Sequence, residues 1–419
     1  MRPVFIIRKA LPTAAALVLL LAGLAKAQAA AGRLHWVGSW AAAQQLPEPQ
    51  NSLAPDDLRD ATLRQIVHLS IGGSQLRVRL SNAFGTAPLE ITSVHIARPV
   101  SASTSRIDAA SDKALTFSGA TRVVVPAGAE YVSDPASFPA RALSDLAITL
   151  HISRPPSQQT GHPGSRTTSY LAHGDLVAAP ELSGAKRADH WYWISGVDVA
   201  VSHLASSLVI LGDSITDGHG ATLNENNRWP DGLARRLQGA PAARMIGVLN
   251  EGLGGNRLLL DGLGPNALAR FDRDVLAQTG VRYLIVLEGV NDLGMLTHAG
   301  DAPLSAHRAL VRRIILAYEQ MIDLAHSHGI RIIGATILPY TGSDYYHPGS
   351  ASEADRRAIN RWIRAPRHFD VVIDFDKIMR DPKHPERLRP AYDSGDHLHP
   401  SPAGYRVMGD AVPLTLFRP

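Results

Sequence analysis

The feature that most constrains the fold is a change in hydrophobic periodicity near residue 204. Before it, apolar and polar residues alternate, as in the segment from Leu146 to Ile152. Alternation gives a strand one buried face and one wet face, so this part predicts antiparallel sheets. After it, the apolar runs are short and nearly continuous, which is typical of parallel strands covered by helices. The chain therefore predicts two domains of different classes.

Residues 33–203 are expected to form an accessory domain, an antiparallel β-sandwich of the jelly-roll type. Two alternating runs, from Leu63 to Ile71 and from Leu76 to Leu80, are separated by the pair Gly72-Gly73. A Gly-Gly pair between two such runs predicts a hairpin turn. In the first run Arg64 falls among the polar positions, so it is expected on the wet face of the strand.

Residues 204–419 are expected to form a doubly wound α/β domain. Amphipathic helical patterns lie between the apolar runs, most clearly from Ser305 to His328. In sheets of this class, ligands bind beyond the carboxyl ends of the strands. The expected strands are Leu208 to Leu211, Met245 to Leu249, Tyr283 to Leu287, Ile330 to Ile337 and Val371 to Phe375.

The first 27 residues have the pattern of a secretory signal peptide. A basic start with Arg2, Arg8 and Lys9 precedes an apolar run from Ala10 to Leu24, and small-residue cleavage patterns follow around Ala27. A retained membrane anchor is the alternative, but the run is shorter than the roughly 20 apolar residues that a span needs. We therefore expect a secreted or periplasmic protein without a membrane span after cleavage.

Charge and cysteine content exclude several classes of partner and site. Cleavage after Ala27 removes four of the 42 basic residues and no acid, which leaves 38 basic against 38 acidic residues. A neutral mature chain gives no indication of a nucleic-acid or anionic-membrane partner. The chain has no cysteine, which excludes disulfides and thiolate metal ligands. Nothing in the sequence defines the oligomeric state.

Polar, glycine-rich segments follow the predicted strands where those strands end. Because the carboxyl ends of parallel strands meet at one edge of a sheet, we expect these segments to converge. A serine, an asparagine, glycine-rich turns and an Asp-His pair would then lie together, as in a serine hydrolase. The segments are Gly212 to Thr216, Asn250 to Asn256, Glu288 to Asp292 and Asp396 to Pro400.

Residue chemistry assigns a role to each member of this set. A serine hydroxyl needs an adjacent base, so Ser214 is the expected nucleophile and His399 the expected base. Asp396, three residues earlier, can orient the imidazole and stabilise its cation. The oxyanion would accept hydrogen bonds from the backbone N–H groups of Ser214 and Gly255 and from the Asn291 side chain.

The four segments resemble, in order, the four sequence blocks of the SGNH, or GDSL, hydrolase family. Ser214, Gly255, Asn291 and the pair Asp396 and His399 occupy the positions of that family's functional residues, and Ile215 replaces the usual leucine. The resemblance implies a flavodoxin-like three-layer α/β/α domain, no metal or other cofactor, and hydrolysis of esters. Family members cleave acetyl groups from sugars, short-chain esters and lysophospholipids. The β-rich part resembles the N-terminal domain of two-domain bacterial GDSL esterases.

Other interpretations of individual residues stay open. His397 and His399 form a His-x-His pair that could bind a metal, although no HExxH motif accompanies it. Asn250 is expected to form a turn, Asp213 and Asp292 are expected to brace their loops, and Asp217 has no assigned role. The aromatic residues Trp191, Tyr192 and Trp193 are expected in the core, whereas Tyr340, Tyr345 and Tyr346 fit either the rim of the loop or a sugar-stacking surface. The loop from Gly161 to Arg166 could reach over the pocket.

Several functions are compatible with the motif. The first is a secreted carboxylic-ester hydrolase that removes acetyl or other short acyl groups from a carbohydrate, with an acetylated polysaccharide as a candidate substrate. An O-acyltransferase acting on extracellular glycans shares the chemistry and differs only in the acceptor. A lipid or aryl esterase is a further alternative. A glycan-binding module beside an inert site comes from a different class, and the intact set of motif residues argues against it.

Overall fold

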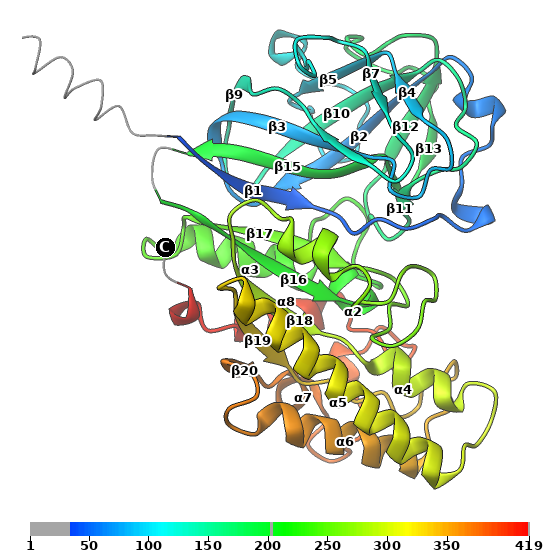
Figure 1. Ribbon diagram of the computed structural model, residues 1–419, viewed down its shortest axis with the longest axis vertical. Coiled ribbons are helices and arrows are strands. Elements are labelled where there is room, and N and C mark those ends of the chain that lie inside the picture. Colours follow the sequence, from blue (N-terminus) through cyan, green and yellow to red (C-terminus); the bar gives the residue numbers. More distant parts are fainter. Residues whose placement is uncertain (1–33, 202–203, 418–419) are drawn as a thin grey trace, which may run out of the picture.

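The computed structural model describes residues 34–201 and 204–417, and the expected signal peptide lies outside them (Figure 1). The β-rich part contains two large antiparallel sheets and two short strand pairs, β11-β14 and β4-β7. The first sheet has the order β1-β15-β3-β8, with β9 also pairing with β3, and the second has the order β13-β12-β2-β10-β5-β6. The strands are β1 His35–Ala41, β2 Ala61–Leu69, β3 Gly73–Ser81, β4 Leu89–Ile91, β5 Ser93–Ala97, β6 Lys113–Ala114, β7 Val123–Val125, β8 Glu130–Val132, β9 Ala136–Ala140, β10 Ser144–Ile152, β11 Gly161–His162, β12 Ser169–His173, β13 Lys186–Ala188, β14 Trp191–Tyr192 and β15 Ile194–Val201.

The two sheets enclose one hydrophobic core. Leu76 and Val199 of the first sheet and Leu63 and Leu146 of the second are buried in the same cluster. The expected burial of the aromatic run 191–193 is confirmed, since its three side chains lie in this core. Alternating strands thus form an antiparallel sandwich around their apolar faces.

The hairpin predicted at Gly72-Gly73 is wrong. Strands β2 and β3 lie in different sheets, so the pair connects the two layers. A Cβ atom on Gly72 would lie 2.4 Å from the Ala140 carbonyl oxygen, and one on Gly73 would lie 2.6 Å from that of Ala200. The glycines therefore permit close backbone approach to the neighbouring strands β9 and β15 of the first sheet and do not form a two-residue turn.

The predicted exposure of Arg64 is also wrong, because its side chain is fully buried. Loops cover this face of the second sheet, and the guanidinium donates to the carbonyl oxygens of Ser105, Val177 and Ala179. It also donates to the Thr149 hydroxyl. Burial lowers the pKa of Arg64 to about 10. A strand pattern cannot show that loops distant in sequence will cover its polar face.

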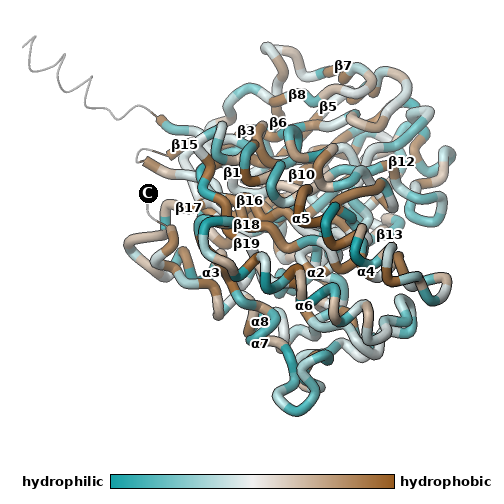
Figure 2. Tube along the Cα trace, turned by 60° about the horizontal axis from the view of Figure 1, so that its bottom comes forward, coloured by the Kyte–Doolittle hydropathy of each residue, from teal (hydrophilic) through white to brown (hydrophobic). Residues whose placement is uncertain are grey.

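The C-terminal part contains a single five-stranded parallel sheet in the order β17-β16-β18-β19-β20. This is the 2-1-3-4-5 strand order of flavodoxin-like folds. All five predicted strands form, with bounds shifted by a few residues. Figure 2 shows hydrophobic segments concentrated along the central strands β16, β18 and β19. The strands are β16 Ser206–Gly212, β17 Ile246–Gly252, β18 Val281–Leu287, β19 Arg331–Ala335 and β20 Val371–Ile373.

Helices cover both faces of this sheet. Helix α5 packs against α4 and α6, whereas α3 packs against α8, and Figure 1 shows the two groups on opposite sides of the sheet. Within the described ranges, no helix is both long and apolar enough to cross a membrane. The helices are α2 Ser214–Asp217, α3 Trp229–Gly239, α4 Val290–Thr297, α5 Leu304–Ser327, α6 Ser350–Arg364, α7 Phe375–Met379 and α8 Pro402–Ala411, and the short helical turns are Pro49–Asn51, Asp56–Leu58, Ala109–Ser111, Asp272–Leu276, Pro390–Tyr392 and Leu414–Leu416.

The two parts meet along strand β1, which lies beside β16 and β17 (Figure 1). The backbone N–H of Gly38 donates to the Ser207 hydroxyl over 3.0 Å and to the Thr279 carbonyl oxygen over 3.1 Å. A Cβ atom on Gly247 would lie 2.0 Å from the Gly38 carbonyl oxygen, so glycine is required at that position. The backbones of the two parts are therefore in direct contact.

Candidate active site

Ser214 is presented by a single helical turn at the end of β16. The Asp213 side chain caps this turn by accepting from the Ile215 N–H over 2.9 Å, and Gly218 ends it with a φ of 101°. Ser214 occupies the first helical position, where a backbone N–H has no carbonyl partner within the helix. That N–H is therefore available to an anion at the end of the strand.

Ser214, His399 and Asp396 form a continuous hydrogen-bonded chain. The Ser214 Oγ lies 2.8 Å from His399 Nε2, and His399 Nδ1 lies 2.6 Å from Asp396 Oδ2. Asp396 Oδ1 accepts from the backbone N–H groups of Leu398 and His399 over 3.0 and 2.9 Å. Partial burial raises the pKa of Asp396, but the hydrogen bonds from His399 outweigh it and hold that pKa below its ordinary value. The carboxylate thus stays charged and fixes the proton on His399 Nδ1.

The expected oxyanion donors, Gly255 and Asn291, come after β17 and β18, the two strands that pair with β16. Gly212 of β16 pairs with Gly252 of β17 and with Leu287 of β18. Gly255 and Asn291 therefore lie shortly beyond the same sheet edge as Ser214. Gly255 has a φ of 67°, a left-handed conformation that favours glycine.

The orientation of the Asn291 amide is defined by two partners. Its Nδ2 donates to the Asn256 carbonyl oxygen over 2.7 Å, and its Oδ1 accepts from the Tyr346 hydroxyl over 2.5 Å. The amide group has two N–H bonds, so one donor is left after the bond to Asn256. Next to it, Asp292 accepts from the backbone N–H groups of Leu258 and Leu259, which anchors the loop that follows Gly255.

The buried side chain of Arg270 forms hydrogen bonds to the ends of two strands at this edge. Arg270 donates to the carbonyl oxygens of Gly212 over 3.0 Å and of Glu251 over 2.8 Å. It also pairs with Asp274 over 2.9 Å and with Glu288 over 3.5 Å. Burial raises the pKa of Asp213 to about 7 and that of Glu288 well above its ordinary value. This buried polar group positions the turns that carry the candidate catalytic residues.

His219 was not foreseen as a site residue. Its ring centroid lies 4.1 Å from that of His399, and its Nε2 lies 3.9 Å from Asp396 Oδ2. Its Nδ1 accepts from Nη2 of Arg166 over 3.1 Å. Burial, followed by the positive charge of His399 and of Arg166, lowers the pKa of His219 to about 4. The ring is therefore neutral at neutral pH, with its proton on Nε2.

One set of ligand atoms has the spacing of a metal site. Atoms of His219, Asp396 and His399 lie within 4.8 Å of one another. These atoms already form the hydrogen-bonded chain to Ser214, so an ion there would compete with it. His397, the other member of the His-x-His pair, instead pairs with Asp393 over 2.6 Å.

The loop from Gly161 to Arg166 reaches the turn that carries Ser214. His162 is buried, with Nε2 at 2.9 Å from Asp217 Oδ1 and Nδ1 at 2.7 Å from the Ala43 carbonyl oxygen. A carbonyl oxygen can only accept, so His162 Nδ1 donates to Ala43 and Nε2 is left facing the Asp217 carboxyl group. The β-rich part thus supplies a buried hydrogen-bond partner to the last residue of the nucleophile turn.

The remaining sequence expectations have clear structural positions. The turn expected at Asn250 is wrong, because this residue lies within β17, where its side chain accepts from the Gly252 N–H and donates to the Thr216 carbonyl oxygen. Tyr346 is buried against Asn291, whereas Tyr345 is 58% exposed. His219 could have been suspected from its position five residues after Ser214. The sequence allowed the loop from Gly161 to Arg166 to reach over the pocket, but it singled out neither His162 nor Arg166, because their partners are distant in sequence.

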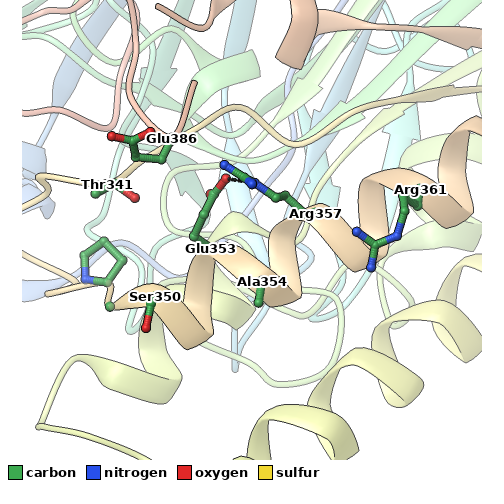
Figure 3. A pocket seen from close by; sticks show the side chains of 9 residues that line it. Thr341, Ser350, Glu353, Ala354, Arg357, Arg361 and Glu386 are labelled. Carbon is green, nitrogen blue, oxygen red and sulfur yellow. Dashed lines mark hydrogen bonds and ion pairs between the residues drawn. The ribbon is translucent and has the colours of Figure 1, made fainter. Parts of the chain in front are cut away.

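One surface hollow is separate from these residues. It has a volume of about 550 Å³ and lies between α6 and the loop that precedes it (Figure 3). Figure 3 shows Glu353 paired with Arg357, while Arg361 lies farther along the helix. Neither Ser214 nor His399 lines it, so the chemistry is not located there.

The C-terminal part is similar to known proteins. Residues 210–407 match the model of the GDSL-like lipase/acylhydrolase family. One similar solved structure is a candidate lipolytic protein of the G-D-S-L family from Desulfitobacterium hafniense, with 25% identity, coverage of 49% of this chain and 97% of that chain, and a TM-score of 0.36. Others are a GDSL-like lipase from Bacteroides thetaiotaomicron (18% identity, 49% and 85% coverage, TM-score 0.36) and an acetyl xylan esterase (18% identity, 49% and 96% coverage, TM-score 0.36). Among curated proteins, none matches the chain.

Proposed function

We propose that this protein, a carboxylic ester hydrolase whose residues 210–407 are a GDSL-like lipase/acylhydrolase domain, acts through an acyl-enzyme on Ser214. The observation that carries this mechanism is the chain of hydrogen bonds from Ser214 through His399 to Asp396, with distances of 2.8 and 2.6 Å. A nucleophile, a base and an orienting carboxylate in this arrangement are the parts of a serine hydrolase.

The reaction follows from the positions of these groups. His399 Nε2 takes the proton from Ser214 Oγ as that oxygen attacks the ester carbonyl carbon. The negative oxygen of the tetrahedral intermediate accepts hydrogen bonds from the N–H groups of Ser214 and Gly255 and from the Asn291 amide. His399 then gives its proton to the leaving alcohol, and an attacking water repeats the sequence to release the acid. Asp396 stabilises the imidazolium throughout.

The substrate we propose is an acetyl or other short acyl ester on a carbohydrate outside the cytoplasm, in the medium or the periplasm. The signal-like first 27 residues support the location, and the β-rich part, proposed to be a jelly-roll-like accessory domain, supports a polymeric substrate. The rim beside His399 is polar, with Arg166 and His219, which suits a polar alcohol. Transfer of the acyl group to a sugar hydroxyl and hydrolysis of lipid or aryl esters are the alternatives.

Hydrolysis of p-nitrophenyl acetate by the wild type and by Ser214→Ala tests the mechanism. We expect the substitution to lower kcat by about 10³ or more, because the nucleophile is lost. Ser327→Ala, a change at an exposed serine on α5, is the matched control and should keep wild-type activity. Equal rates for the wild type and Ser214→Ala would refute the assignment of the nucleophile. Acyl transfer to added oligosaccharide in excess of free acetate would favour the transferase alternative.

A further inference from the structure

Arg166 brings a cation from the β-rich part to the rim of the catalytic site. Its Nη2 donates to His219 Nδ1, and the His219 ring lies against the ring of His399. His399 is the group that returns a proton to the leaving alcohol in the proposed reaction. Arg166 and His219 therefore lie on the side of the site that the alcohol part of an ester would occupy.

The backbone of Arg166 is held in an unfavourable conformation. Its φ is 51°, in the left-handed region that residues with a Cβ rarely adopt. Its carbonyl oxygen accepts from the Asn224 N–H over 2.9 Å, and Asn224 Oδ1 in turn accepts from the Thr168 N–H over 2.8 Å. Strained backbone of this kind clusters at functional sites, where the surrounding structure imposes it.

The charge of Arg166 is not neutralised within the described residues. Two carboxylates of the site have other partners, since Asp217 pairs with His162 and Asp396 pairs with His399. No ion pair of Arg166 with an acidic side chain is found in residues 34–201 and 204–417, and its buried Nε has no hydrogen-bond partner there. His219 accepts a hydrogen bond from Arg166, but an imidazole carries no negative charge that could neutralise the guanidinium. A half-buried guanidinium without an anion is a candidate for binding one.

We propose that Arg166, with His219 beside it, forms a subsite for a carboxylate carried by the alcohol part of the ester, an inference that rests on the hydrolase function proposed above. Only Nη2 of the guanidinium faces His219, so other N–H donors of its planar fork are left for carboxylate oxygens. The chemistry fits an acylated sugar acid, in which the ester and the carboxylate lie on one residue.

The test compares two acetyl esters of the same shape, 4-acetoxybenzoate and the neutral 4-acetoxybenzamide. We expect Arg166→Gln to lower the ratio of kcat/KM for the benzoate to that for the benzamide by about tenfold, through KM, as for loss of one charge-assisted hydrogen bond. Arg166→Lys should recover part of the ratio, because it keeps the charge without the fork. Arg361→Gln, at an exposed arginine on α6, is the control and should keep the wild-type ratio. Higher ionic strength should reduce the preference of the wild type.

A binding measurement separates failure of the subsite from failure of the proposed function. Calorimetry of 4-acetoxybenzoate with Ser214→Ala and with Ser214→Ala/Arg166→Gln needs no turnover. We expect roughly tenfold weaker binding in the double variant. In one outcome, both proteins hydrolyse the benzamide, and the ratio of kcat/KM for the benzoate to that for the benzamide is the same in Arg166→Gln as in the wild type. That outcome would overturn the subsite and leave the hydrolase function intact. An inactive wild type that still binds the benzoate through Arg166 would overturn the function and leave the subsite.

Discussion

Replacing His162 with glutamine should weaken both the fold and the catalytic turn. The side chains of His162 and Asp217 are only 3% and 5% exposed, and their atoms are 2.9 Å apart. Removing the hydrogen-bond partner of a buried polar group leaves that group unsatisfied and costs about 1–3 kcal/mol, more where the group is charged. Glutamine can still donate one hydrogen bond, so we expect the lower end of this range. Because Asp217 ends the turn that begins at Ser214, kcat should fall as well, by up to about 10² for a displacement near 1 Å.

A double-mutant cycle measures this coupling. Urea unfolding of the wild type, His162→Gln, Asp217→Asn and the double variant should show the double variant losing clearly less free energy of unfolding than the two single losses together. The control is His173→Gln, at an exposed histidine that contacts only a backbone carbonyl, and it should change stability by about 0.5 kcal/mol or less. Additive losses across the cycle would refute the coupling. Full activity in His162→Gln would refute the role of the pair in positioning Ser214.

Two further predictions concern Asn291 and Asp213. Tyr346→Phe removes the hydroxyl that donates to Asn291 Oδ1, so kcat for p-nitrophenyl acetate should fall about fivefold while KM changes little, as loss of one hydrogen bond of about 1 kcal/mol allows; an unchanged kcat would contradict the orienting role. The raised pKa of Asp213, about 7 against an ordinary 3.8, means that the native state binds the proton more tightly than the unfolded state. Stability therefore falls as pH rises from about 4 to about 7. Asparagine at position 213 can still cap the turn. As pH rises from about 4 to about 7, the urea midpoint of Asp213→Asn should therefore increase relative to that of the wild type. A difference between the two midpoints that does not change with pH would refute the assignment.

Local patterns predicted the parts of the structure that depend on local chemistry. The runs around Leu208 and Tyr283 became β16 and β18 because continuous apolar segments can be buried only between two layers of helices. The polar segments after them converged because parallel strands in register end at one edge. The same register places the segments of Gly255 and Asn291 at the sheet edge that carries Ser214, and their role as oxyanion donors stays a prediction.

The expectations that proved wrong or incomplete concern contacts between segments distant in sequence. Gly72 has the pattern of a hairpin, but its neighbour is Ala140 of another strand. Arg64 has the pattern of an exposed residue, but loops from elsewhere in the chain enclose it. The loop that contains His162 and Arg166 was expected to be able to reach over the pocket, but the contacts of these two residues depend on how the β-rich part packs on the sheet edge.

The contact along β1 also covers β17, the edge strand of the parallel sheet. Strand β17 is the last strand of its sheet on that side, and an open strand edge invites pairing with other chains. Here the Val248 N–H donates to the Ser70 hydroxyl over 2.8 Å, and Leu249 lies close enough to Gly38 that no larger residue would fit there. The β-rich part therefore covers the outer edge of β17. A C-terminal part without it would expose that edge, and its copies would be prone to associate by strand pairing.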